Sequence, residues 1–255
     1  RSGIQWAGVG MLIATVATFF LPGLHNIGLM VAAIVIGVGL NWIWGKKVAI
    51  TDMPQMVALF NGMGGGSAAA IGAVELVRFS LGGQAAPDRL TLALGVIGAL
   101  IGAVSLTGSV IAWAKLDGRM DKRYTFPGQQ WFNALVALLT VGLGIAAVWT
   151  MSLPVIISFF VLALVLGVLL ILPIGGADMP VVISLYNAFT GLAVAFEGYV
   201  LGNEALIIAG TMVGAAGMLL TRLMAKAMNR SIKNVLFSNF GGGSAEIAGD
   251  GRGGA

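Results

Sequence analysis

Long apolar runs separated by short polar connections dominate the chain, and the connections hold most of the charged side chains. Eight runs can cross a bilayer, because a span needs about 20 mostly apolar residues to cover a hydrocarbon core of about 30 Å. The pattern therefore predicts an all-α integral membrane protein, a bundle of about eight transmembrane helices. The predicted spans are residues 4–20, 26–44, 54–79, 89–116, 131–151, 154–172, 179–201 and 204–228.

The composition supports a membrane protein. Hydrophobic residues make up 58% of the 255 residues and charged residues 9%, against roughly 25% charged residues in soluble domains. The first run lacks the basic segment and small-residue cleavage site of a signal peptide, so we expect it to remain in the mature chain. The sequence has no cysteine, which excludes disulfides and thiolate metal sites.

The basic residues predict the orientation. The odd-numbered connections hold only Arg78 and Arg89, whereas the other basic residues lie at the termini, in the even-numbered connections or at the ends of spans that lead into them. Basic segments stay in the cytoplasm, so both termini are predicted to be cytoplasmic. The net charge of +4 then reflects topology and lipid headgroups, and nucleic acid is not needed to explain it. The basic residues on the predicted cytoplasmic side are Arg1, Lys46, Lys47, Lys115, Arg119, Lys122, Arg123, Arg222, Lys226, Arg230, Lys233 and Arg252.

The chain contains an internal repeat. Segment 52–61 begins Asp-Met-Pro and ends in Asn61, and segment 178–187 begins in the same way and ends in Asn187. The two copies are separated by four predicted helices, an even number, so both enter the membrane from the same side and the repeat is parallel. We expect Asp52 and Asp178 to act as helix N-caps, with proline in the first turn.

Few polar side chains lie within the spans, where they usually face the bundle interior or a hydrated path. In the 179–201 span, Ser184, Asn187 and Thr190 recur every three residues and Glu197 follows seven residues later, which predicts one polar stripe. Such a stripe either holds a file of waters or bonds neighbouring helices together. Asn61 lies at a similar depth in the 54–79 span.

Other polar residues are predicted to have local roles. Glu75 and Glu197 are expected to reach water at the outer membrane surface, and His25 falls in the short outer connection between the first two spans. Hydroxyls in the 89–116 span are expected to bond back to their own helix carbonyls; they are Ser105, Thr107 and Ser109.

The glycines predict close helix packing. Gly98 with Gly102 and Gly210 with Gly214 have the small-xxx-small spacing of packed membrane helices. The glycine-rich run 62–67 lies inside a span and follows no strand, so it does not predict a phosphate-binding loop. The eight predicted spans place residues 1–240 in one transmembrane domain. The polar, glycine-rich residues 241–255 are predicted to form a flexible segment, either a linker to a further domain or a tail.

Several segments resemble the membrane domain of the proton-translocating NAD(P) transhydrogenase beta subunit. They are Gly-Gly-Ala-Asp-Met-Pro-Val-Val at 175–182, Lys-Ala-Met-Asn-Arg-Ser at 226–231, Lys-Lys-Val at 46–48 with Thr-Asp-Met-Pro at 51–54, and Thr-Gly-Ser-Val at 107–110. In that family hydride passes between NADH and NADP on two soluble domains while a proton crosses the membrane domain.

The resemblance implies that this chain carries the proton path and not the hydride-transfer site. It implies an NADP(H)-binding domain after residue 255, with 241–255 as its linker, and no cofactor or metal within these residues. It also implies an alpha subunit that supplies the NAD(H) domain and further transmembrane helices, a homodimer of such assemblies, and a multi-pass location in the bacterial inner membrane.

The resemblance also assigns candidate residues. Asn187 matches an asparagine on the family's proton path, and Thr190 lies one turn further along the helix; Asn61 and Ser184 complete the predicted path. Some family members have a relay histidine at the position of Asn61, and asparagine cannot carry the proton as an ionised group. We therefore expect the relay histidine to come from an alpha-subunit helix. The predicted cytoplasmic gate and coupling residues are Asp178, Lys226, Arg230 and Gly217.

Two other functions fit parts of the pattern. A parallel repeat with polar residues near its openings also suits a secondary transporter of a small solute, which would take up its substrate without partner domains. A passive membrane anchor would tolerate apolar substitutions in the predicted polar stripe.

Overall fold

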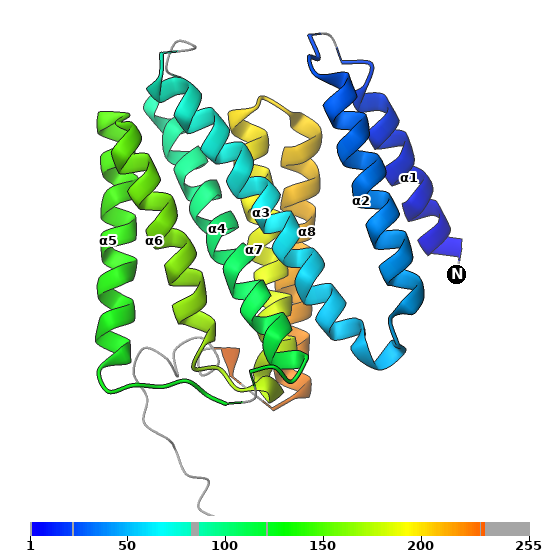
Figure 1. Ribbon diagram of the computed structural model, residues 1–255, viewed down its shortest axis with the longest axis vertical. Coiled ribbons are helices and arrows are strands. Elements are labelled where there is room, and N and C mark those ends of the chain that lie inside the picture. Colours follow the sequence, from blue (N-terminus) through cyan, green and yellow to red (C-terminus); the bar gives the residue numbers. More distant parts are fainter. Residues whose placement is uncertain (1, 22, 83–86, 121, 230, 233–255) are drawn as a thin grey trace, which may run out of the picture. The chain divides into compact units, whose positions relative to one another are not determined.

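The computed structural model describes residues 2–21, 23–82, 87–120, 122–229 and 231–232. These residues form eight α-helices and no strand (Figure 1). Two short 3₁₀ turns, η1 (Ile50–Asp52) and η2 (Gly176–Asp178), precede α3 and α7. The helices are α1 (Ser2–Thr18), α2 (Ile27–Lys47), α3 (Met53–Ser80), α4 (Arg89–Leu116), α5 (Gln129–Thr150), α6 (Leu153–Ile171), α7 (Met179–Val200) and α8 (Glu204–Ala227).

The helix lengths confirm the prediction of an all-α membrane bundle. In the described part of the chain, seven helices are long and apolar enough to cross a membrane, and α1 is a shorter apolar helix of 17 residues. The observed bounds lie within three residues of the predicted spans. Continuous apolarity over about 20 residues is a strong signal because no soluble helix needs it.

The chain divides into two compact units, Arg1–Ile50 and Thr51–Ala255. The first unit contains α1 and α2, and neither helix has a buried residue. His25 lies in the connection between these helices, as predicted, and is exposed. Apolar side chains that stay exposed on a membrane helix can face lipid or other helices.

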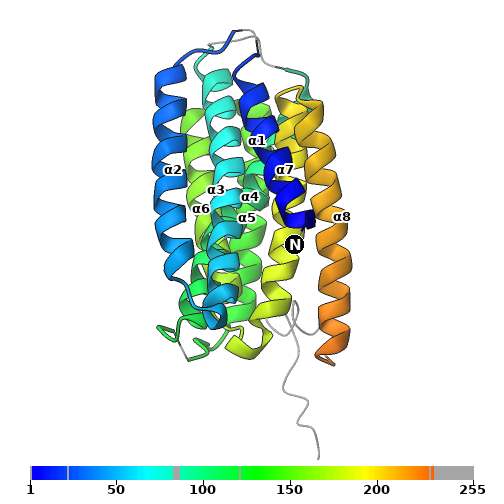
Figure 2. The ribbon, with the colours of Figure 1, turned by 90° about the vertical axis from the view of Figure 1, so that its right-hand side faces the viewer.

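The second unit is organised around α4, which contacts α3, α5, α6 and α7 (Figure 1). α7 in turn packs along α8, and Figure 2 shows these two helices side by side. The core of this unit therefore consists of the faces that α3, α4 and α7 turn toward one another. Here lie most of the buried polar side chains of the three helices.

Glycines permit the closest of these contacts. A Cβ atom at Gly102 would lie 2.6 Å from the carbonyl oxygen of Gly65, across the contact between α3 and α4. A Cβ atom at Gly191 would lie 2.6 Å from the backbone nitrogen of Gly214, across the contact between α7 and α8. The packing role predicted for the small-xxx-small glycines is therefore confirmed.

The two copies of the repeat begin alike. α3 and α7 each follow a 3₁₀ turn that ends in aspartate, each has proline in its first turn, and both run in the same direction in Figure 1. Asp52 and Asp178 occupy the predicted N-cap positions, but neither side chain makes a cap hydrogen bond. Each aspartate closes a 3₁₀ turn with ψ near 0°, whereas a capping residue adopts an extended conformation.

Candidate functional site

A cluster of four buried polar side chains joins α3, α4 and α7. The Nδ2 atom of Asn61 donates to the hydroxyl of Ser109 at 3.0 Å and is 3.3 Å from that of Ser105. The Ser105 hydroxyl shares a 2.6 Å hydrogen bond with the hydroxyl of Thr190. All four side chains are buried. We call Asn61, Ser105, Ser109 and Thr190 the polar cluster.

Glycines on α3 allow the polar cluster to form. A Cβ atom at Gly62 would lie 3.0 Å from the Cβ atom of Ser109, and one at Gly65 would lie 2.8 Å from that of Ser105. α3 and α4 therefore approach closely enough for the short serine side chains to reach Asn61. The prediction that these serines bond back to their own helix is wrong. Thr107 does bond to its own Ala103 carbonyl, and also to a carbonyl of α6.

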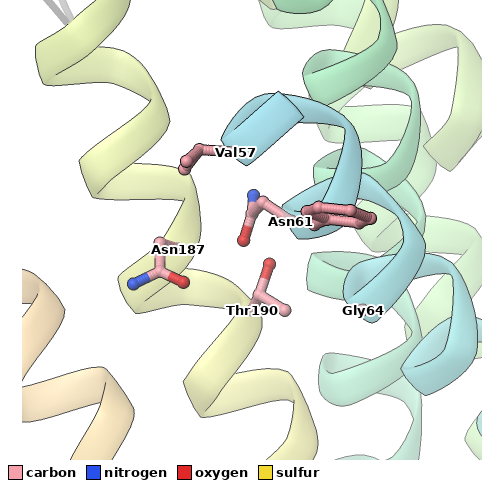
Figure 3. Close-up of a pocket in the computed structure, with 6 residues that line it drawn as sticks. Val57, Asn61, Gly64, Asn187 and Thr190 are labelled. Atoms are coloured by element: carbon pink, nitrogen blue, oxygen red, sulfur yellow. The ribbon is translucent and has the colours of Figure 1, made fainter. Parts of the chain in front are cut away.

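The polar cluster opens into a pocket of about 330 Å³ between α3 and α7 (Figure 3). The Oδ1 atom of Asn61 has no hydrogen-bond partner among the described residues. Figure 3 shows the side chains of Asn61 and Thr190 directed toward one another, with Asn187 on the neighbouring turn of α7. The lining residues are Val57, Phe60, Asn61, Gly64, Asn187 and Thr190.

Three of the four residues predicted for the proton path thus meet at one pocket, and Ser184 does not. The hydroxyl of Thr221 on α8 lies 3.0 Å from that of Ser184, so Ser184 faces α8. A step of three residues turns a helix by about 300°, and two such steps place Ser184 about 120° from Thr190. The predicted single stripe is therefore split between two faces of α7.

Glu197 forms a second polar layer, two turns beyond Thr190 on the same face of α7. Its side chain is 1% exposed, and neither carboxylate oxygen has a hydrogen-bond partner among the described residues. Cβ atoms at Gly72 and Gly98 would lie 2.6 and 2.7 Å from its Oε1 atom. The prediction that Glu197 reaches the surface is wrong, because the carboxyl group occupies a niche between the backbones of α3 and α4.

Glu75 behaves more as predicted. It lies one turn beyond Gly72 on α3, its side chain is 13% exposed, and it forms an ion pair of 3.1 Å with Arg78. This pair lies near the end of α3, where water or lipid headgroups can reach it.

Two of the residues predicted for the gate lie at the other end of this unit. Asp178 ends η2 directly before α7, and Lys226 is exposed in the last turn of α8. A Cβ atom at Gly217 would lie 2.9 Å from the Cα atom of Ala188, so this glycine sets the distance between α8 and α7 beside Asn187. Arg230 lies outside the described residues.

The polar cluster and the layer formed by Glu197 differ in their chemistry. Hydroxyl and amide groups such as those of the polar cluster can orient waters and pass hydrogen bonds, but they do not ionise near neutral pH. A carboxyl group such as Glu197 can take up and release a proton.

The glycine-rich run 62–67 lies inside the 28-residue helix α3, so it does not form the strand, turn and helix that bind a dinucleotide.

Comparison with known proteins gives a consistent result. The sequence model of the family described as NAD(P) transhydrogenase beta subunit matches residues 1–253. Two curated relatives, both named NAD(P) transhydrogenase subunit beta and both from Rhodospirillum rubrum, are 40% identical to this chain over 255 residues. The alignment covers 98% of this chain and 55% of each relative, so the chain spans about half the length of these proteins.

Proposed function

Because this chain belongs to the family of NAD(P) transhydrogenase beta subunits, we propose that its helical bundle conducts protons across a membrane. Conduction is coupled to hydride transfer between NADH and NADP, which takes place on soluble domains outside these residues. The chain is thus the proton-conducting part of a proton-translocating transhydrogenase. Neither dinucleotide binds to the bundle itself.

The observation that supports this proposal is the polar cluster and the pocket beside it. Buried polar groups in a membrane protein are costly, and they are retained where they bind to one another or line a hydrated path. Here Asn61 and Thr190 do both, since they are bonded within the cluster and also line the pocket with Asn187. Waters held by these side chains would carry the proton at this depth.

The pocket also suits a partner helix. Val57 and Phe60 on its rim are 49% and 44% exposed, so an apolar rim surrounds a polar floor. A transmembrane helix of the alpha subunit would cover this rim and place a histidine against Asn61 and Asn187. Histidine titrates near neutral pH, which asparagine and threonine do not.

Access to this site would be controlled at the end where α3 and α7 begin. In this proposal Asp178, Lys226 and Arg230 face the NADP(H)-binding domain, which follows residue 255, and Gly217 transmits movement of α8 to α7. That end and both termini lie on the cytoplasmic side of the bacterial inner membrane. Two such assemblies form the complete enzyme.

Glu197 would serve the outer half of the path. It lies on the face of α7 that carries Thr190, two turns or about 10 Å farther along the helix. An ionised carboxylate is costly in an apolar niche, so a proton that reaches Glu197 is held there until water enters from the outer side. This role adds a titratable group to a path whose other described members do not ionise.

The test uses the complete enzyme in sealed vesicles, with proton uptake and hydride transfer measured together. We expect Asn187→Ala to abolish proton pumping and to slow the coupled reverse reaction, while the protein still folds. Thr190→Val should have the same direction of effect, with a loss of about tenfold or more, because it removes the bond to Ser105.

Thr211→Val provides a matched control. Thr211 is exposed on α8 and bonds only to the carbonyl of Ile207 in its own helix, so this variant should pump normally. Normal pumping by Asn187→Ala would contradict the proposal and would favour a passive anchor. Solute uptake by this chain without the soluble domains would favour a secondary transporter.

A further inference from the structure

The C-terminal end of α6 is held by a buried lysine from α4. The side chain of Lys115 is buried, and its ammonium group donates to the carbonyl oxygens of Leu172 at 2.5 Å and Ile174 at 2.7 Å. The ion pairs found among the described residues, Arg78 with Glu75 and Arg119 with Asp117, do not include Lys115.

Physical chemistry explains why these carbonyls attract a cation. The last carbonyl groups of a helix have no donor within the helix, and together they carry the negative end of the helix dipole. Lys115 donates to two carbonyls at this end, and the backbone N–H of Tyr124 donates to Leu172 at 3.4 Å. The Nδ2 atom of Asn133 on α5 reaches the carbonyl of Leu169 at 3.4 Å. The end of α6 is therefore bonded to α4, to α5 and to the connection between them.

The same connection packs against the turn that leads to α7. A Cβ atom at Gly175 would lie 2.7 Å from the Nη2 atom of Arg123, so the guanidinium group rests on the backbone of this glycine. Three residues later Asp178 ends η2, and α7 begins. Lys115 and Arg123 thus hold both sides of the turn from α6 into α7.

Lys115 also lies on the helix that contributes to the polar cluster. Ser109 is six residues earlier on α4, fewer than two turns away, and the Gln55 side chain of α3 bonds to the Leu116 carbonyl at 3.0 Å. The last two turns of α4 therefore connect the start of α3, the start of α7 and Asn61. A shift of the α6–α7 turn would move α7 along its own axis relative to α4, and would move Asn187 and Thr190 with it.

We propose that Lys115 is a positioning residue for the proton path, which fixes the start of α7 against α4 by holding the end of α6, with Arg123 bracing the turn at Gly175. This inference rests on the proposed function of the bundle. It assigns Arg123 a part in coupling, because a domain that displaces this side chain would also displace the turn that leads into α7.

The experiment compares Lys115→Met with Lys122→Met in the complete enzyme. Methionine preserves the length and apolar stem of Lys115 and removes the ammonium. Lys122 is an exposed lysine of the α4–α5 connection that forms no side-chain hydrogen bond or ion pair with another described residue. We expect Lys115→Met to reduce proton-coupled hydride transfer about tenfold and Lys122→Met to leave it unchanged. Lys115→Arg retains a cationic donor and should recover part of the loss.

A distance measurement separates positioning from general stability. These 255 residues contain no cysteine, so cysteines placed at Thr51 and Ala177, both exposed, allow spin labels beside the starts of α3 and α7. Lys115→Met should broaden or shift the distance distribution well below the melting temperature. Gly175→Ala, which displaces only the end of Arg123, should do so more mildly, and it decides the question if Lys115→Met fails to fold.

The outcomes distinguish this inference from the proposed function. If Lys115→Met melts at a lower temperature but retains its distances and coupled rate, Lys115 only stabilises the fold and the inference is overturned. An equal loss in Lys122→Met would also overturn it. If the unaltered enzyme transfers hydride without moving protons, the proposed function fails, and the distances still decide whether Lys115 positions α7.

Discussion

The niche around Glu197 allows a quantitative test of the structure. In Gly98→Ala the new Cβ atom would lie 2.7 Å from the Oε1 atom of Glu197 and 3.1 Å from the Cβ atom of Phe196. The carboxyl group has little room to retreat toward α3, because it lies against the backbone at Gly72, where a Cβ atom would be 2.6 Å from the same oxygen. Overpacking of this kind costs about 1–3 kcal/mol. The higher helix propensity of alanine offsets about 0.5–1 kcal/mol of this cost, so we expect the free energy of unfolding to fall by about 1 kcal/mol.

A double-mutant cycle isolates the contact. Glu197→Ala removes the closest contact, so in that background Gly98→Ala keeps the 3.1 Å contact with the Cβ atom of Phe196 and should become close to neutral. The coupling energy should therefore fall within about 1–3 kcal/mol, as for other residues in direct contact. Gly142→Ala is the matched control, because no atom lies within 4 Å of its Cβ position. It should raise stability slightly in both backgrounds.

The assay is thermal unfolding of the purified assembly in detergent at one scan rate, because membrane proteins seldom unfold reversibly and only the order of melting temperatures is then meaningful. Gly98→Ala should melt below the unaltered protein, whereas Gly98→Ala with Glu197→Ala should melt close to Glu197→Ala alone. If Gly98→Ala lowers the melting temperature equally in both backgrounds, the carboxyl group does not occupy this niche.

Two further predictions concern Glu197 and the start of α4. Glu197→Gln preserves the shape of the side chain and removes its proton chemistry, so the melting temperature should stay close to that of the unaltered protein while the proton-coupled rate falls about tenfold; an unchanged rate in sealed vesicles would show that Glu197 carries no proton. A hydrogen bond from the Thr91 hydroxyl, with others from backbone N–H groups, holds the pKa of Asp88 below its ordinary value of 3.8. This stabilisation is complete above the ordinary value and is lost as the pH falls through the lowered pKa, so melting curves recorded below about pH 4 should drop less steeply for Asp88→Asn.

The spans and the start of each repeat copy were predictable from the sequence. Each span is a continuous apolar run, and the Asp-Met-Pro segments at 52–54 and 178–180 mark the two helix starts directly. The same local signals predicted that Asn61 and Asn187 lie at equivalent depths, and the structure brings both to one pocket, where Asn61 is buried and Asn187 is partly exposed. These features depend on residues that are close together in the sequence.

Features that depend on contacts between helices could not be predicted in this way. Ser105 and Ser109 bond across to Asn61 because glycines of α3 bring the two helices together, and without that approach they would bond within α4. Glu197 is buried because glycines of two other helices leave a niche for it. Spacing along α7 predicted that Ser184 shares one stripe with Asn187 and Thr190. In the structure Ser184 instead bonds to Thr221 of the neighbouring helix α8.

The spacing of the two polar layers bears on how a proton path can avoid leaking. Thr190 and Glu197 are seven residues apart on α7, and the antiparallel helix α4 places Ser105 and Gly98 opposite them with the same separation. The residues between the layers, 191–196 on α7 and 99–104 on α4, are all apolar or glycine. A gap of about 10 Å between α4 and α7 without polar side chains from these two helices does not pass protons unless water enters it. In the proposed function, a movement that admits water to this gap would therefore be the coupled step, and the closely packed glycines of α3, α4 and α7 keep the path closed between such movements.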